Sequence, residues 1–423
     1  MDELERDLER LLRDDKWRLE PEPDALDRVH SGAARRSRRR RATAGTLSAV
    51  SVVAVAVVGV SSVLQTGGEP VADDASPESA GSPQALKSAT SEPGNQRRTG
   101  EPDRTVPVPA GFRSASITAL SPSMFWALGS AKCDDGRCTT VARTTDGGRT
   151  FDALPSAPTA PVAAGDGSAR TVRDLRFASA MDGFAFGGAL WSTHDGGASW
   201  SPQRLPGNVV RLEAARSTVW ALVRAGGAHE LYRSPADRDS WQRVRLPVQL
   251  DDSAADLAVQ ADTVTVTGAT NGRAVSAASS DGGQRFRTGD SPCDPAFGAR
   301  ISASDKALWL FCPTGTQGRP YVSTDAGRSW QPTDATPAGG WPNSTVAGAR
   351  SADSAVLGAG RHLYMVDDDE VRQAGTPSGA AGGFDFIGFT TPTVGYAVLD
   401  RPARSALWRT TDGGRTWSVV RPH

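Results

Sequence analysis

The sequence of 423 residues is poor in the side chains on which enzyme chemistry most often depends. Its five histidines are scattered along the chain, and none lies near either pair of its four cysteines. The spacing of a zinc site is therefore missing. Phosphate-binding loops and nucleophile elbows are missing as well. These absences argue against a metal enzyme and against a nucleotide-binding protein, and we expect no cofactor.

Lysine is almost absent, with 4 lysines against 43 arginines, although the net charge is only -1. This bias is typical of GC-rich coding DNA and suggests an actinobacterium-like source. Six of the arginines form a cluster at 35–41. Alone, such a cluster would suggest nucleic-acid binding. It directly precedes an apolar run, however, which fits the positive-inside rule of membrane proteins better. We therefore expect no nucleic-acid partner.

Long hydrophobic runs are absent except for 42–64, which has 23 residues without a charge. That length suffices to span a bilayer. We predict a transmembrane helix at 42–64, a cytosolic tail at 1–41 and everything after residue 64 outside the cytosol. A secretory signal peptide is the competitor, but too many residues precede the apolar run. Residues 65–103 are rich in Ser, Pro and Gly and predict a disordered linker.

The tail carries one short amphipathic pattern. Leu4, Leu8 and Leu11 lie on one face of a predicted helix that ends before Pro21. Such a segment is too short to hold a core of its own. Either it is simply a charged cytosolic tail, or its leucine face docks on a cytosolic partner.

The remainder, 104–423, repeats one pattern, Ser/Thr-x-Asp-x-Gly-x-x-Trp/Phe, which we call the Asp turn. The aspartates and final aromatics of its five clear copies are Asp146 and Phe151, Asp195 and Trp200, Asp281 and Phe286, Asp325 and Trp330, and Asp412 and Trp417. A degraded copy ends at Trp241, and an eroded one lies near 364–371. Seven units of about 41–49 residues, each with several short strands, predict a seven-bladed β-propeller with four-stranded blades.

Each Asp turn can be explained without chemistry. Asp-Gly and Gly-Gly between apolar runs are strong hairpin signals, because glycine accepts the positive φ that such turns need. The carboxylate can accept hydrogen bonds from the turn backbone, and the aromatic can be buried between neighbouring sheets. One aspartate per turn does not supply the several oxygen ligands of a calcium loop. We therefore interpret these residues as structural.

All four cysteines lie in the repeat region. Cys133 and Cys138 flank a predicted hairpin turn; Cys293 precedes the first strand of the fifth blade and Cys312 ends the second, and these adjacent strands could bring the two together. Two local disulfides are typical of an oxidising compartment. This agrees with an extracytoplasmic propeller.

The repeats resemble the Asp-box, or BNR repeat, and blades such as 394–417 look like those of WD40/YVTN/BNR-like propellers. That superfamily includes sialidases, sortilin-type receptors and photosystem assembly factors, so the resemblance indicates the fold more than the activity. It implies that the Asp turns lie between the third and fourth strands, on the face opposite the usual ligand site.

A sialidase would need an arginine cluster, a tyrosine nucleophile with a glutamate base, and an acidic catalyst. Its Phe/Tyr-Arg-Ile-Pro motif is matched only by Phe112-Arg113, without the Ile-Pro. We therefore predict a non-catalytic, membrane-anchored binding or scaffold propeller for a protein or glycan. The alternatives are a sialidase-like glycoside hydrolase and a transmembrane sensor. Trp341, outside the repeat positions, is our candidate exposed contact; a packed loop aromatic is the other interpretation.

Overall fold

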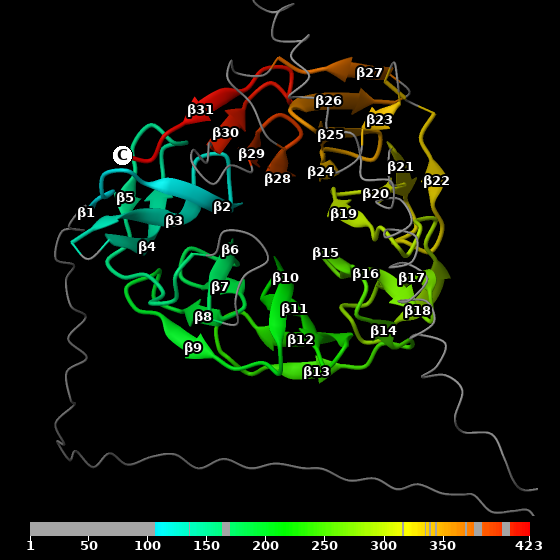
Figure 1. Cartoon of the computed structure of the whole chain (residues 1–423), viewed down its shortest axis with the longest axis horizontal. Helices are drawn as coiled ribbons and strands as arrows, with labels where there is room; N and C mark the ends of the chain where they lie inside the picture. Colours follow the sequence, from blue (N-terminus) through cyan, green and yellow to red (C-terminus); the bar gives the residue numbers. More distant parts are fainter. Residues whose placement is uncertain are drawn as a thin grey trace, which may run out of the picture. The chain divides into compact units, whose positions relative to one another are not determined.

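The structure, a computed structural model, is an all-β propeller of seven sheets around a central axis (Figure 1). It describes residues 106–134, 136–162, 170–314, 317–334, 336–337, 340–342, 345–368, 370–375, 383–399 and 407–423. The predicted tail 1–41, membrane span 42–64 and linker 65–103 lie outside these ranges. Within them, no helix is long and apolar enough to cross a membrane.

Every blade is an antiparallel meander that runs from an innermost to an outermost strand. The first three blades are β2 (Arg113–Ala119), β3 (Phe125–Cys133), β4 (Gly136–Thr144) and β5 (Asp152–Ala153); β6 (Val172–Phe177), β7 (Gly183–Gly187), β8 (Leu190–Thr193) and β9 (Ser201–Gln203); and β10 (Asn208–Ala215), β11 (Thr218–Ala225), β12 (Ala228–Pro235) and β13 (Gln242–Val244). The fourth and fifth are β15 (Asp256–Gln260), β16 (Thr263–Thr270), β17 (Arg273–Ser279) and β18 (Arg287–Asp290); and β19 (Arg300–Ala303), β20 (Leu308–Pro313), β21 (Gln317–Ser323) and β22 (Gln331–Pro332). The last two are β24 (Thr345–Ala349), β25 (Ser354–Ala359), β26 (His362–Asp367) and β27 (Glu370–Gln373); and β28 (Phe384–Phe389), β29 (Gly395–Leu399), β30 (Leu407–Thr410) and β31 (Ser418–Val420). The seven four-stranded blades predicted from the repeat are therefore present.

Three blades carry an additional short edge strand. These strands are β1 (Val106–Pro107) beside β5, β14 (Leu250–Asp251) beside β12, and β23 (Trp341–Pro342) beside β21. The last of them corrects the expectation for Trp341. Its side chain is only 2% exposed and lies edge-on to Phe311 and Tyr364. Pairing with β21 turns the indole into the core, so Trp341 is a packed aromatic and not a surface contact.

The hydrophobic core lies between neighbouring blades rather than inside any one of them. The second strand of a blade is covered on both faces, and its residues are correspondingly apolar and buried, as in Phe125–Leu128 and Leu308–Cys312. Aromatic pairs join adjacent sheets; Trp126 of the first blade stacks on Phe177 of the second at 4.1 Å between ring centroids. Burial at these interfaces, at about 25 cal/mol per Å² of apolar surface, is what holds the blades together.

Among the described residues, no strand is shared between the first and last blades. β1 pairs with β5 inside the first blade, and the last blade is complete in β28 to β31. The junction is formed by side chains: Phe125 lies 4.8 Å from Tyr396 between ring centroids, and the Tyr396 hydroxyl donates to the Pro122 carbonyl. This agrees with the expectation that closure needs no N-terminal strand.

Candidate functional site

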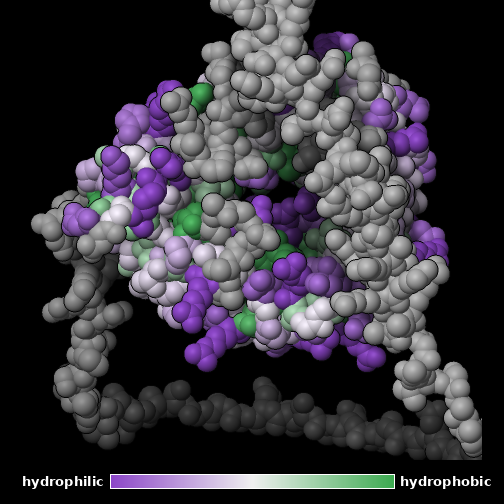
Figure 2. All heavy atoms as spheres, in the orientation of Figure 1, coloured by the Kyte–Doolittle hydropathy of each residue, from purple (hydrophilic) through white to green (hydrophobic). Residues whose placement is uncertain are grey.

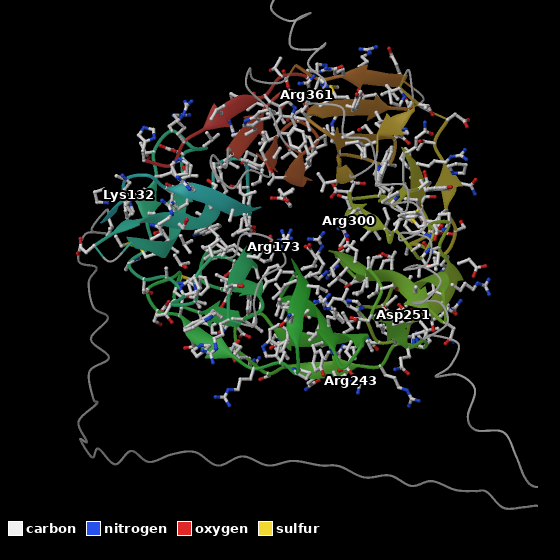
Figure 3. All side chains as sticks on the ribbon, viewed as in Figure 1. Lys132, Arg173, Arg243, Asp251, Arg300 and Arg361 are labelled. Atoms are coloured by element: carbon white, nitrogen blue, oxygen red, sulfur yellow. A yellow bond between two sulfur atoms is a disulfide. The ribbon has the colours of Figure 1, made fainter. Side chains whose placement is uncertain are left out.

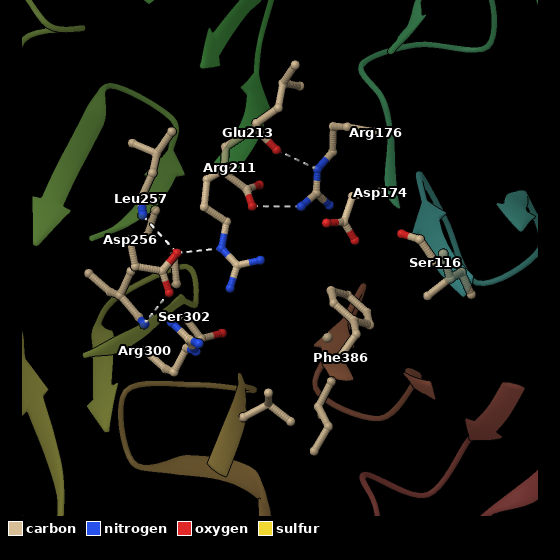
Figure 4. Close-up of a pocket in the computed structure, with 18 of the residues that line it drawn as sticks. Ser116, Asp174, Arg176, Arg211, Glu213, Asp256, Leu257, Arg300, Ser302 and Phe386 are labelled. Atoms are coloured by element: carbon tan, nitrogen blue, oxygen red, sulfur yellow. Dashed lines mark hydrogen bonds and ion pairs between the residues drawn. The ribbon is translucent and has the colours of Figure 1, made fainter. Parts of the chain in front are cut away.

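A pocket of about 240 Å³ occupies the central channel and is lined by the innermost strands of the blades (Figures 2 and 4). Figure 2 shows the opening at the axis with many hydrophilic residues around it. The charged residues that line the pocket are Asp174 and Arg176 on β6, Arg211 and Glu213 on β10, Asp256 on β15, Arg300 on β19 and Asp385 on β28. Four acidic and three basic side chains therefore meet at one place.

Some of these charged residues lie at the end of the channel opposite to the Asp turns, whereas Arg176 and Glu213 lie in the later part of their strands. In a meander, the innermost strand ends on the same side as the third strand, and every Asp turn follows a third strand. Asp256 and Arg300, in contrast, are the first residues of their innermost strands. We call the side where the innermost strands begin the mouth face. The blade-to-blade loops and the loops between second and third strands also lie there.

Two ion pairs connect neighbouring blades across the pocket. Arg176 donates to Glu213 at 2.7 Å and to the Leu212 carbonyl at 3.2 Å. Arg211 donates through Nε to Asp256, whose other oxygen accepts from the backbone N–H of Ile301 at 3.2 Å (Figure 4). Asp256 thus connects three blades, because β10, β15 and β19 are consecutive innermost strands.

The channel perturbs the acid–base properties of these groups. The negative charge of Asp256 raises the pKa of Arg211 and so keeps its guanidinium charged. Burial raises the pKa of Glu213, although Arg176 and Arg211 partly offset that effect. The carboxylates of Asp256 and Glu213 each pair with an arginine, and these ion pairs fix Arg211 and Arg176 in place.

Arg300 differs from the other pocket arginines. Among the described residues its side chain makes no hydrogen bond and no ion pair, and the residue is exposed. Figure 3 shows Arg300 and Arg173 pointing into the central opening. Because protein surrounds the channel, desolvation lowers the pKa of Arg300, and the nearby positive charges of Arg211 and Arg173 act in the same direction, against the attraction of Asp256.

The predicted Asp-turn residues lie between third and fourth strands. In the first turn, Asp146 accepts from the backbone of Arg149 at 2.9 Å and Thr150 at 3.0 Å, and from the Thr150 hydroxyl at 2.7 Å. The hydrogen bonds from Thr150 hold the pKa of Asp146 well below its usual range. The same arrangement surrounds the aspartates at 195, 281, 325 and 412. All donors belong to the turn itself.

The aromatics that close these turns pack against the clusters between blades. Phe151 and Trp417 are 6% exposed, while Trp200, Trp241, Phe286 and Trp330 are partly buried. Trp200, for example, meets Phe177 edge-on at 6.3 Å between ring centroids. The Asp turns and their aromatics therefore have a structural role and lie away from the charged pocket.

His194, one of the five scattered histidines, lies between two carboxylates. Its Nδ1 lies 3.0 Å from Asp182, and its Nε2 lies 3.3 Å from Asp239 in the degraded turn of the next blade. Asp239 also accepts from Ser192 at 2.7 Å and Gln203 at 2.7 Å. Burial alone would lower the pKa of His194, but the two carboxylates outweigh it and raise the pKa.

A tyrosine and a glutamate do meet in the third blade, but away from the channel pocket. The Tyr232 hydroxyl donates to Glu230 at 2.7 Å on β12, and Glu230 pairs with Arg243 at 2.8 Å. Burial and the neighbouring carboxylate raise the pKa of Tyr232 to about 12. A nucleophilic tyrosine needs the opposite shift. In the channel, Tyr396 lines the pocket, but its hydroxyl donates to the Pro122 carbonyl.

Both predicted disulfides are formed. Cys133 and Cys138 join β3 to β4 near the tip of their hairpin, with Cα atoms 6.0 Å apart. Cys293 and Cys312 have Cα atoms 4.8 Å apart and enclose β19 in the loop that they close. The residue that begins β19 is Arg300. No group of three or more potential metal ligands occurs among the described residues.

The charged pocket itself was missed at the sequence level. The signal was present in the innermost strands, where Asp174-Leu175-Arg176 and Arg211-Leu212-Glu213 alternate charged and buried apolar residues. Alternation places the charged residues on one face. Only the closed ring shows that this face is a channel, because a β-strand by itself does not reveal what it faces.

Comparisons with known proteins identify the fold and no family. No family model and no curated protein matches the chain. Solved structures do: YCF48 bound to a D1 peptide is 16% identical, with a TM-score of 0.50 over 73% of this chain and 95% of that one. Sqt1 of Saccharomyces cerevisiae is 11% identical, with a TM-score of 0.46 over 74% and 86%. An ancestral GH74 enzyme is 13% identical, with a TM-score of 0.47 over 74% and 46%. At these identities the likeness extends to the propeller fold alone.

Proposed function

We propose that this chain is a membrane-anchored, extracytoplasmic binding protein whose propeller recognises a protein or glycan ligand at the mouth face. One observation carries the proposal: a water-accessible pocket at the axis holds charged side chains from several blades, preorganised by inter-blade ion pairs. Concave sites with a few convergent polar groups are where proteins most often bind ligands.

A protein ligand has the better support of the two. YCF48, which has the same fold, was solved bound to a D1 peptide. The pocket is small for an oligosaccharide, at about 240 Å³, but it accommodates one side chain or a chain end. The mouth-face loops would then contact the rest of the ligand.

Anchoring and orientation rest on the sequence. The apolar run 42–64 follows an arginine cluster, which predicts the N-terminus in the cytosol. Two disulfides in the propeller are consistent with an oxidising compartment. Protease added to intact cells should remove the propeller and leave the tail protected; protection of the propeller would contradict this orientation.

Ligand binding is tested with the full chain purified from membranes in detergent. We expect a second protein to co-purify with the wild-type chain. It should no longer co-purify with the Arg211→Gln, Asp256→Asn double variant, because those two residues preorganise the pocket. Arg238→Gln changes an exposed residue of the degraded turn, on the side opposite the mouth face, and serves as the control. Retention of the ligand by the double variant would contradict binding at the mouth face.

A sialidase-like glycoside hydrolase is the second candidate, because arginines and Glu213 do converge in the channel. The tyrosines argue against it, since Tyr396 is engaged with Pro122 and Tyr232 lies outside the pocket. Hydrolysis of fluorogenic glycosides, a sialoside among them, that Glu213→Gln abolishes would establish this function instead.

A sensor role remains the third candidate and depends on the tail, which lies outside the described residues. Co-purification of a cytosolic protein that is lost on replacing Leu4 and Leu8 by alanine would support it.

A further inference from the structure

One charged side chain in the pocket has no hydrogen-bond or ion-pair partner among the residues that the structure describes. Arg300 projects into the channel from the first residue of β19, and no described carboxylate lies within ion-pair distance of it. Asp256, the carboxylate that attracts it electrostatically, is already engaged by Arg211 and by the backbone of Ile301. The Arg300 guanidinium has five N–H donors. None of them has an acceptor among the neighbouring described residues.

Arg211 adds donors on the same side of the pocket. Its Nε donates to Asp256, and its two terminal nitrogens point into the pocket (Figure 4). Arg173 reaches the same opening from β6, with its side chain 49% exposed and only a 4.0 Å contact to Asp174. Guanidinium groups from three blades therefore face the central opening, and two of them, those of Arg211 and Arg300, line the pocket.

The acids of the pocket restrict which anion fits. Asp174 lies on the opposite side from Arg300, beside Arg176 (Figure 4). Its carboxylate would repel a doubly charged phosphate or sulfate, but it can accept an N–H from a ligand. A ligand with one carboxylate next to peptide N–H groups fits both the arginines and Asp174. An arginine binds a carboxylate through two parallel hydrogen bonds, and Asp174 accepts from a peptide N–H.

From this juxtaposition we infer that the channel pocket is a carboxylate-binding site for a peptide, with Arg300 and Arg211 as donors to the carboxylate and Asp174 as an acceptor for a peptide N–H. The volume of about 240 Å³ admits one acidic side chain or one chain terminus. The inference rests on the proposed function, since it names the chemical group that the mouth face would recognise.

Four short peptides test the chemistry on the full chain in detergent by titration calorimetry. Acetyl-Gly-Gly-Glu-amide carries a side-chain carboxylate, and acetyl-Gly-Gly-Gly with a free terminus carries a main-chain one. Acetyl-Gly-Gly-Gln-amide and acetyl-Gly-Gly-Gly-amide are their neutral counterparts. We expect one or both acids to bind and neither neutral peptide to do so, and the two acids distinguish side chain from terminus. Equal binding of acids and neutral peptides, no binding at all, or tighter binding of inorganic phosphate would overturn the inference.

Variants then assign the donors. Arg300→Gln should weaken binding of the acid by about 10- to 100-fold, because a hydrogen bond to a charged group is lost. Arg300→Lys keeps the positive charge but lacks the planar guanidinium, so its affinity for the acid peptide should lie between those of the wild type and Arg300→Gln. Arg243→Gln, at the outer edge of the third blade (Figure 3), should bind like the wild type. Thermal unfolding of each variant verifies that the propeller is intact. An Arg300→Gln protein that is folded and binds the acid normally would sink the assignment.

Failure of the inference and failure of the proposed function give different results. If the chain captures a protein ligand that Arg300→Gln captures equally well, the proposed function stands and the carboxylate site is wrong. If acid peptides bind through Arg300 but no macromolecular ligand is captured, the site stands and the binding-protein proposal loses its support.

Discussion

At the scale of the residue, the aspartate of each Asp turn acts as an internal cap. Asp412 accepts from the Thr410 hydroxyl at 2.8 Å and from the Thr416 backbone and hydroxyl at 3.0 and 2.6 Å. Replacing it by alanine leaves these donors without their partner. We expect Asp412→Ala to lower the free energy of unfolding by about 1–3 kcal/mol, measured by denaturant titration.

The control for Asp412 comes from the degraded turn. Asp237 is exposed and, within the part of the chain that the structure describes, pairs only with the adjacent Arg238, so Asp237→Ala should change stability by less than about 0.5 kcal/mol. The pH dependence has a definite sign. Burial alone would raise the pKa of Asp412, but the hydrogen bonds from Thr416 and Thr410 lower it. Its contribution is therefore present above the unfolded value of about 3.9 and lost as the pH falls below it. Equal effects of the two variants would contradict the capping role.

His194 predicts a pH dependence of the opposite sign. Its pKa is raised in the folded protein by Asp182 and Asp239, so protonation favours folding. The stabilisation is fully present below the unfolded value of about 6.5 and is lost as the pH rises through the higher folded value. His194→Gln should therefore destabilise the propeller more at pH 5.5 than at pH 9, measured by chemical unfolding. His423→Gln, at the exposed C-terminus, should show no such difference, and a pH-independent loss in His194→Gln would contradict the bridge.

At the scale of the element, the repeat predicts strands well and their surroundings poorly. Turns such as 144–151 specify their own hydrogen bonds, so their sequence is sufficient to identify them. The extra strand β23 has only two residues and depends on pairing with β21, which no local pattern encodes. That pairing buries Trp341. His194 was missed for the same reason, because one of its partners, Asp239, belongs to the next blade.

The disulfide around β19 makes a prediction that joins stability to the pocket. Cys293 and Cys312 are 19 residues apart, so their bond removes much freedom from the unfolded chain. Replacing both by serine should cost about 2–4 kcal/mol. Arg300 lies inside that loop, so binding of carboxylate peptides should weaken as well.

Cys133 and Cys138 supply the matched control for that experiment. They are only 5 residues apart at a hairpin, so the entropy lost on closing their loop is smaller. The corresponding double serine variant should be less destabilised and should retain peptide binding. The opposite order of stabilities, measured by thermal unfolding, would contradict the loop argument.

At the scale of the whole molecule, the ring is a closed series of similar interfaces. Polar contacts reinforce it near the axis: Leu175 and Phe177 donate backbone N–H groups to Ser116 and Thr118 of the preceding blade, and Ala349 donates to Ser302. These contacts run between innermost strands, as do the ion pairs of the pocket. Arg211, which would donate to a ligand, therefore also holds two blades in register through Asp256.

Closure depends on the junction of the first and last blades, which has no common strand. Tyr396 is 2% exposed there, packs on Phe125 and donates to the Pro122 carbonyl, to which Arg409 also donates at 3.2 Å. Tyr396→Ala should lower the free energy of unfolding by about 3–5 kcal/mol, as is typical of a large buried aromatic, and should lower the unfolding temperature of the propeller as a whole.

Val106→Asp, on the exposed edge strand β1, tests the alternative that the N-terminal strand closes the ring. Because β1 pairs only within the first blade, its variant should unfold like the wild type. Strong destabilisation by Val106→Asp with a mild effect of Tyr396→Ala would mean that a strand, and not side-chain packing, closes the ring.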